Sequence, residues 1–196
     1  MTAVTSPFTE PSRCKRLKAA SSRDHDSVDQ LVMAARPFEN RERYGRFLQV
    51  QHRFHGSLLA LYQDEQLNQQ LPGLAALSRF AAVEADLRDL GLSLPTSTQP
   101  VCVSSAQALG WLYCSEGSNL GAAFLYKHTQ RLGLEGDKGA RHLAPHPDGR
   151  ALHWRAFVAR LDSLVLGEQE EAEVVKGAIA AFDSYRRHLR EVFAGL

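Results

Sequence analysis

Hydrophobic side chains recur along this chain mainly at spacings of three and four residues, which is the period of an amphipathic helix. No stretch shows the regular alternation of apolar and polar residues that marks a strand with one exposed face. The longest patterns predict helices over about 41–62, 104–132 and 168–193, and shorter ones over about 13–21, 24–36, 74–90 and 154–165. The sequence therefore predicts an all-α fold.

Two internal stretches interrupt the helical pattern. Residues 91–103 are rich in Pro, Ser and Thr, and residues 133–150 contain prolines and glycines that rule out a continuous helix. The first dozen residues are also rich in Ser, Thr and Pro. Because a chain of 196 residues suits one domain, we predict a disordered segment at 1–12 and a single helical domain over 13–196.

The helix expected over 104–132 carries two glycines on its apolar face. Tyr113, Gly117, Gly121 and Phe124 recur at helical spacing, so the two glycines lie one turn apart. Each glycine inside a helix costs about 1 kcal/mol relative to alanine, which suggests a use for bare backbone. Two interpretations stay open: close packing against another helix, or a flat ligand lying across the backbone.

Polar side chains interrupt two other apolar stripes. His25 heads the stripe of the helix over 24–36 and is expected to face inward, as a hydrogen-bonded core residue or as a ligand. Gln51 and His55 interrupt the stripe of the helix over 41–62 at positions i and i+4. Burying either side chain without a partner costs on the order of 1–3 kcal/mol. The pair therefore predicts an interhelical polar network or a wet pocket.

The overall composition limits the possible functions. A net charge of +1 gives no sign of a nucleic-acid surface, and no apolar run approaches the roughly 20 residues that span a membrane. The first residues lack the apolar core of a signal peptide, and the three cysteines form no Cys-x-x-Cys pair. We therefore expect reduced thiols and a cytoplasmic protein.

Several common catalytic motifs are absent from the sequence. There is no P-loop or dinucleotide fingerprint, no nucleophile elbow and no repeated Glu-x-x-His pair for a di-iron centre. His142 and His146 are four residues apart, but Pro145 lies between them, which disfavours zinc binding. What remains is a helical chain with one histidine expected to face inward and one helix whose glycines leave the backbone uncovered on its apolar face. This combination suits haem, whose iron commonly binds imidazole.

Four segments carry a resemblance to a known family. They are Gly110–Leu125 (GWLYCSEGSNLGAAFL), His25–Met33 (HDSVDQLVM), Gly139–Arg150 (GARHLAPHPDGR) and the following His153–Val158 (HWRAFV). The similarity runs in order from about residue 16 to residue 193. The sequence resembles the bacterial haem oxygenases, most closely the neisserial-type branch that serves iron acquisition.

This resemblance implies a single-domain, all-α haem oxygenase-like fold in which haem lies between a proximal and a distal helix. His25 would be the axial iron ligand, and the backbone at Gly117 and Gly121 would lie over the haem. Four side chains would support ordered water on the distal side: Gln51, His55, Asn119 and Trp154. Four others would contact the haem periphery, Lys18 and Tyr113 at the propionates and Phe182 and Tyr185 in the pocket.

The activity implied by the resemblance is the degradation of haem, as both substrate and cofactor, with dioxygen (O2) and electrons to biliverdin, carbon monoxide and ferrous iron. Because the chain has no flavin or nicotinamide motif, electrons would come from a donor such as an NADPH-dependent reductase or a ferredoxin. We expect a monomer with no nucleic-acid partner and no membrane span. The alternatives are a non-catalytic haem-binding or haem-trafficking protein, and a helical protein that binds another small molecule.

The position of haem cleavage can also be predicted from the resemblance. Family members that cut at the β or δ carbon carry Asn and Phe at the positions of Lys18 and Tyr113, and Lys at the positions of Met33 and His128. The side chains present here therefore predict cleavage at the α carbon and the IXα isomer of biliverdin.

Overall fold

The computed structural model describes residues 12–95 and 98–194 of the chain. The disordered segment predicted at 1–12 lies outside these residues except for Ser12, and two residues of the loop predicted over 91–103 lie outside them as well.

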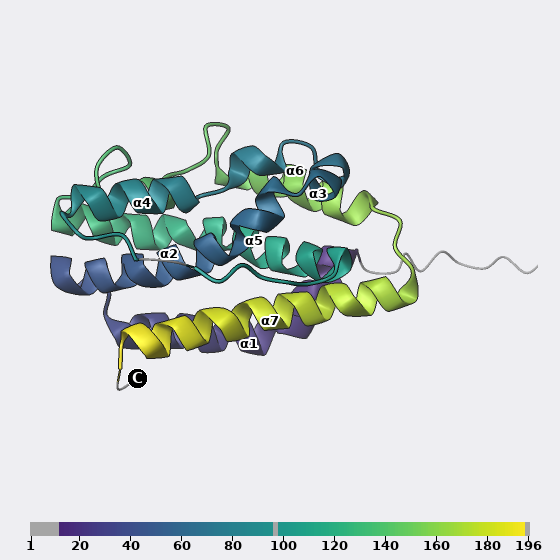
Figure 1. Ribbon diagram of the computed structural model, residues 1–196, viewed down its shortest axis with the longest axis horizontal. Coiled ribbons are helices and arrows are strands. Elements are labelled where there is room, and N and C mark those ends of the chain that lie inside the picture. Colours follow the sequence, from purple (N-terminus) through teal and green to yellow (C-terminus); the bar gives the residue numbers. More distant parts are fainter. Residues whose placement is uncertain (1–11, 96–97, 195–196) are drawn as a thin grey trace, which may run out of the picture.

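The described residues form helices joined by loops (Figure 1). The α-helices are α1 (Arg13–Ala35), α2 (Arg41–Gln63), α3 (Glu65–Gln70), α4 (Phe80–Asp89), α5 (Ser105–Thr129), α6 (Arg150–Ser163) and α7 (Glu168–Val192). Three short 3-10 helices are η1 (Leu74–Leu77), η2 (Gln130–Leu132) and η3 (Arg141–Leu143). Over the described ranges, extended pairing is limited to isolated bridges of Glu135 with Lys138 and Gly139. The all-α prediction is confirmed.

The N-terminal helix is longer than predicted. The sequence predicts two helices with a break before Asp24, but α1 is continuous from Arg13 to Ala35. No glycine or proline lies between these ends, so nothing in the backbone interrupts the hydrogen bonding. Asp24 does not cap a helix; its carboxylate instead accepts a hydrogen bond from Arg186 of α7.

The single helix predicted over 74–90 is divided in two. Pro72 and Gly73 form a turn, η1 follows, and α4 begins only at Phe80. Between them the guanidinium of Arg79 donates to the carbonyl oxygens of His142 and Ala144. This tertiary contact ties the chain before α4 to the irregular segment over 133–150. The periodicity of the sequence cannot register such a contact.

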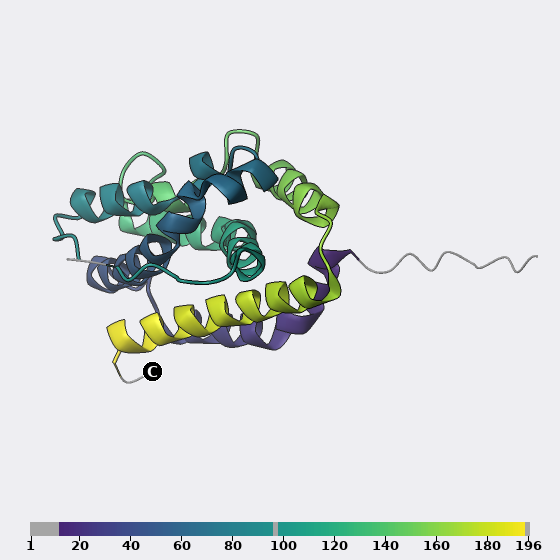
Figure 2. The ribbon, with the colours of Figure 1, turned by 45° about the vertical axis from the view of Figure 1, so that its right-hand side comes forward.

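Helix α7 is the common neighbour that organises the fold. Figures 1 and 2 show α1 and α7 running side by side, with α5 lying across α7 from the other side. Helices α1 and α5 each pack extensively on α7. The site described next lies on these three helices.

Candidate functional site

His25 lies in the middle of α1, and its side chain is 60% exposed. The prediction that it faces inward is therefore wrong. The apolar stripe of α1 does enter the core, since Val32 and Ala35 are buried. His25 lies at the edge of that stripe, where its ring contacts Phe182 of α7 edge-on at a centroid distance of 6.0 Å. An imidazole so placed is anchored on one side and accessible on the other.

Acidic side chains orient the imidazole of His25. Its Nδ1 lies 3.3 Å from Oδ2 of Asp29, one helical turn away, and 3.9 Å from Oδ1 of Asp26. A carboxylate at Nδ1 selects the tautomer that carries the proton there and leaves Nε2 as a lone-pair donor. The guanidinium of Arg186, one turn after Phe182, donates to the carboxylate of Asp24 at 2.9 Å. This bond fixes α1 against α7 directly beside His25.

The glycines of α5 have different surroundings. A Cβ atom added at Gly110 would lie 2.5 Å from the backbone nitrogen of Ala178, and one added at Gly177 would lie 2.8 Å from the carbonyl carbon of Gln107. At Gly117 an added Cβ would lie 3.3 Å from Cη2 of Trp154, whereas at Gly121 it would meet nothing within 4 Å. Close helix packing thus occurs between Gly110 and Gly177. Gly121 faces open space instead.

Apolar side chains on the same helices are exposed. On α5, Leu120 and Phe124 flank Gly121 and are 41% and 54% exposed, and Met33 of α1 is 54% exposed. Large exposed apolar side chains that gather beside bare backbone are typical of a surface for a flat, largely apolar ligand. Lys18 is exposed on α1, two turns before His25. Its ammonium can pair with an anionic edge of such a ligand.

Two of the side chains predicted for the pocket are joined by a hydrogen bond. The amide Nε2 of Gln51 on α2 donates to the hydroxyl of Tyr185 on α7 at 2.6 Å. The ring of Tyr185 also contacts Phe54 edge-on at 5.2 Å. Burial raises the pKa of the Tyr185 hydroxyl, so it stays protonated. The polar position at Gln51 therefore contributes to an interhelical network, as the sequence predicts.

His55 is a buried and neutral imidazole. Its Nδ1 has no hydrogen-bond partner among the described residues. Burial, with smaller electrostatic effects of His142 and Arg79, lowers the pKa of His55 to about 3. A buried nitrogen of this kind is a natural position for an ordered water molecule.

The remaining predicted site residues lie along α5 and α6. Trp154 and Tyr113 contact each other with their ring centroids 5.5 Å apart, beside Gly117. Burial raises the pKa of Tyr113 to about 12. Asn119 is buried on the side of α5 away from Gly117 and Gly121, and its Nδ2 donates to Oε2 of Glu116 at 3.3 Å. The structure thus connects Asn119 to a residue that the sequence analysis missed.

Glu116 is this missed residue, and it is buried with a full set of partners. Its Oε1 accepts a hydrogen bond from the hydroxyl of Tyr62 at 2.6 Å, and its Oε2 lies 2.8 Å from Nε2 of His153. One signal in the sequence could have revealed it, because Glu116 is the only charged residue between Ser104 and Lys127. A single charge in an apolar helix needs a partner in the interior.

Known proteins resemble this chain in sequence and in fold. The family model described as Heme oxygenase matches residues 12–191. Heme oxygenase PigA of Pseudomonas aeruginosa is 43% identical over 185 residues, which cover 93% of each chain. The NO- and CO-bound heme oxygenase of Neisseria meningitidis superposes with a TM-score of 0.90 at 48% identity, covering 94% of this chain and 95% of that one. The heme oxygenase of Leptospira interrogans, at 18% identity and a TM-score of 0.75, covers 92% of this chain and 100% of its own and shares the fold.

Proposed function

The chain belongs to the haem oxygenase family, whose members are oxidoreductases that degrade haem, and we propose that it produces biliverdin IXα, carbon monoxide and ferrous iron for iron acquisition. The observation that carries this proposal is the imidazole of His25, exposed on α1 with Nδ1 held toward Asp29 and Nε2 left for the iron.

The residues of α1, α5 and α7 fit haem. Gly121 has room where a side chain would project, and Leu120, Phe124 and Met33 offer apolar surface for a macrocycle. Haem, when bound, supplies the iron that activates dioxygen and the macrocycle that is oxidised. His25 would hold the iron on the proximal side, and Phe182 would keep its ring in place through their edge-on contact. The relative from Neisseria meningitidis is NO- and CO-bound, which supports a site that would admit small diatomic ligands.

On the distal side, the chain would hold water rather than present an acidic side chain. The amide of Gln51 donates to Tyr185, which leaves its carbonyl oxygen as an acceptor for water. His55, neutral with a free Nδ1, would bind a second water molecule, and Asn119 and Trp154 would extend the network. Gly117 and Gly121 would let the helix backbone lie against the haem face. Such ordered water can pass protons to the reacting oxygen.

The side chains around the haem edge support cleavage at the α carbon. Lys18 is exposed on α1, and Tyr113 stays protonated and half-buried on α5, so each can donate to a propionate. Met33 and His128 would occupy other parts of the edge, where His128 stacks on Phe38 at 5.6 Å. Chromatography of the extracted product is expected to show the IXα isomer. A product dominated by the β or δ isomer would contradict cleavage at the α carbon.

The further expectations concern partners and organisation. We propose that residues 13–196 act as one monomeric domain that receives electrons from a separate donor, such as an NADPH-dependent reductase or a ferredoxin. None of the described helices is long and apolar enough to cross a membrane. All three cysteines are unpaired thiols, which supports a cytoplasmic location.

The first experiment is the visible spectrum of the haem complex, followed in time after adding a reductase, NADPH and catalase. We expect the Soret band to decay while biliverdin absorption and ferrous iron appear. A Soret band that persists under several reductants would favour haem transport without turnover. Absence of haem binding would leave the alternative of another small-molecule ligand.

A further inference from the structure

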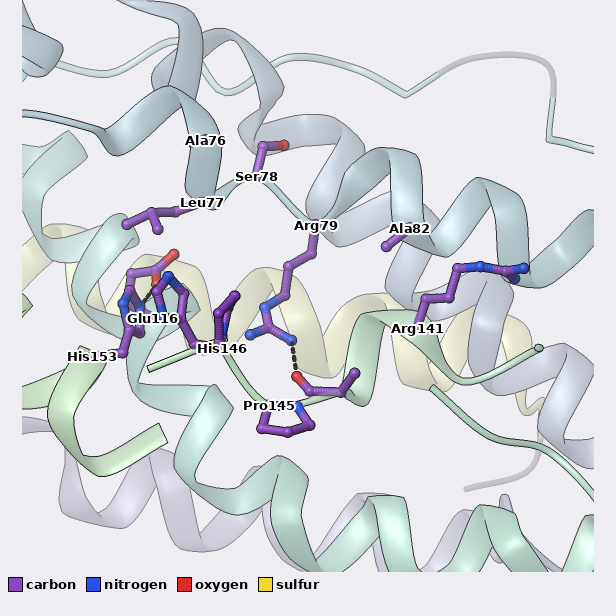
Figure 3. A pocket seen from close by; sticks show the side chains of 12 residues that line it. Ala76, Leu77, Ser78, Arg79, Ala82, Glu116, Arg141, Pro145, His146 and His153 are labelled. Atoms are coloured by element: carbon purple, nitrogen blue, oxygen red, sulfur yellow. Dashed lines mark hydrogen bonds and ion pairs between the residues drawn. The ribbon is translucent and has the colours of Figure 1, made fainter. Parts of the chain in front are cut away.

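A surface cleft lies beside α5, on the side away from Gly117 and Gly121. It is lined by residues 76–79 and 82, Glu116, residues 141 and 144–147, and His153 (Figure 3). Its volume is about 180 Å³, which is too small for a macrocycle and enough for a few water molecules. The cleft is therefore distinct from the His25 face.

At the base of this cleft lies the buried carboxylate of Glu116. Figure 3 shows Glu116 and His153 turned toward each other, joined by the 2.8 Å contact between Oε2 and Nε2. The ring of His146 stacks on His153 at a centroid distance of 4.5 Å. Oε1 of Glu116 accepts from Tyr62, and Oε2 also accepts from Asn119. Glu116 thus connects a residue of the cleft wall with a residue expected in the distal network.

The guanidinium of Arg79 adds a positive charge to the wall of this cleft. It points across the cleft toward the loop at Pro145 (Figure 3) and donates to the carbonyl oxygens of His142 and Ala144. Its positive charge acts to lower the pKa of both Tyr62 and His55. We name the Glu116 cluster by its members: Tyr62, Arg79, Glu116, Asn119 and His153.

A purely structural role accounts poorly for this arrangement. A buried charged group seldom adds net stability over apolar packing, because both charges must be desolvated. Here the buried carboxylate of Glu116 and the half-buried guanidinium of Arg79 also border an open cleft, and the carboxylate accepts a hydrogen bond from Asn119, a residue expected in the distal network. Titratable groups in hydrogen-bonded contact between solvent and an interior site are what proton movement requires.

We propose that the cleft is the entrance through which solvent protons reach the haem pocket, by way of His153 and Glu116. This inference rests on the proposed function. Each proton that leaves Glu116 toward the distal water is replaced by one from His153, and His153 takes its replacement from water in the cleft. The cluster therefore returns to its starting charge, while the electrons for haem oxidation come from the external donor.

The first test uses the haem-free protein, so it does not depend on turnover. Nuclear magnetic resonance can measure how fast the hydrogen-bonded protons of Tyr62 and His153 exchange with solvent. Ala76 is exposed and lines the cleft, so Ala76→Phe should plug it and slow this exchange by at least about fivefold. The neighbouring exposed Ala75 does not line the cleft, and Ala75→Phe should leave the exchange unchanged. Equal exchange rates in the two variants would overturn the proposal.

The second test separates proton transfer from structure during turnover. His153→Gln keeps an N–H donor for Glu116 but cannot carry a proton. The rate of haem degradation should therefore fall about tenfold, and the solvent isotope effect on this rate, measured in D2O, should increase. A structural role would be rescued by Gln and give wild-type rates, which would overturn the proposal. Glu84→Gln, beside buried His52 but outside the cluster, is the matched control with an unchanged rate. If the wild-type protein itself fails to degrade haem, the proposed function fails, whatever the exchange rates show.

Discussion

Gly110 and Gly121 lie on the same helix, about three turns apart, yet their surroundings differ completely. At Gly110 the backbone of α5 approaches that of α7 so closely that a single methyl group would collide with Val174 and Ala178. At Gly121 a methyl group would meet nothing. We call the first region the closed crossing and the second, with His25 on α1, the open face.

The difference shows how one helix combines two functions of glycine. The closed crossing fixes α5 on α7 through direct backbone contact, where no side chain can be accommodated. The open face then extends from this fixed point, with exposed Leu120 and Phe124 beside bare backbone. A rigid crossing next to an open surface can hold a ligand at a defined distance from α7 and from the neighbouring His25.

The largest expected effect is at the closed crossing. Gly110→Ala places a Cβ against backbone atoms of α7, which cannot rotate away as a side chain can. We expect a loss of about 4 kcal/mol in the free energy of unfolding, and a fall in Tm of roughly 8–16 °C. Thermal and urea unfolding followed by circular dichroism measure both. The matched change Gly121→Ala should leave stability unchanged or raise it by up to about 1 kcal/mol. If the two variants are equally stable, Gly110 is not in closer contact with α7 than Gly121 is with its surroundings.

The next effect separates function from stability at the open face. His25→Ala should reduce biliverdin formation by more than about 100-fold, because the iron loses its proximal ligand. Since the side chain is exposed, unfolding free energy should change by less than about 0.5 kcal/mol. Gln30→Ala, at another exposed position of α1, serves as the control. Turnover by the His25→Ala variant without added imidazole would show that the ligand is another residue.

The pH dependence of stability is expected from neither region but from a buried imidazole on α2. Burial lowers the pKa of His55 to about 3. Below pH 6.5 the unfolded chain gains a proton at this histidine and the native protein does not. The free energy of unfolding is therefore highest above pH 6.5 and falls as the pH decreases toward 3. Between pH 7 and pH 5 it falls by about 2 kcal/mol. Burial lowers the pKa of His52 and His142 as well, which adds to the effect.

Urea unfolding at several pH values tests this expectation. The His55→Gln variant should lose less stability than the wild type between pH 7 and pH 5, because one buried titrating group is removed. If both proteins respond to pH alike, His55 is not a source of the acid sensitivity.

The smallest expected effect concerns the open space at Gly121. Gly121→Leu should lower the turnover of haem about tenfold, or about 1.4 kcal/mol, because the new side chain enters the region proposed for the macrocycle. Its unfolding free energy should stay near that of the wild type. Lys127→Leu, exposed on α5 about 120° around the helix from Gly121, should leave turnover unchanged. A Gly121→Leu variant with wild-type turnover and haem affinity would show that the haem does not approach this backbone.

Much of the fold could be predicted because helical periodicity is a local property of the chain. The helix predicted over 41–62 is α2 to within a residue, and the one predicted over 168–193 is α7. The resemblance identified the family because the motifs at Gly110–Leu125 and His25–Met33 are long and in order. The continuity of α1 and the division before α4 were missed. The tertiary contacts of Asp24 and Arg79 there involve residues distant in sequence.

By itself, the sequence determined the helical class, the family and the polar positions at His25, Gln51 and His55, because these depend on residue type and spacing. Only the tertiary structure decided that His25 is exposed, that Gly110 rather than Gly121 packs on α7, and that Glu116 joins α2, α5 and α6. The physical reason is that burial and close contact depend on which second element lies against a residue. A helical pattern states which side chains share a face but not what that face meets.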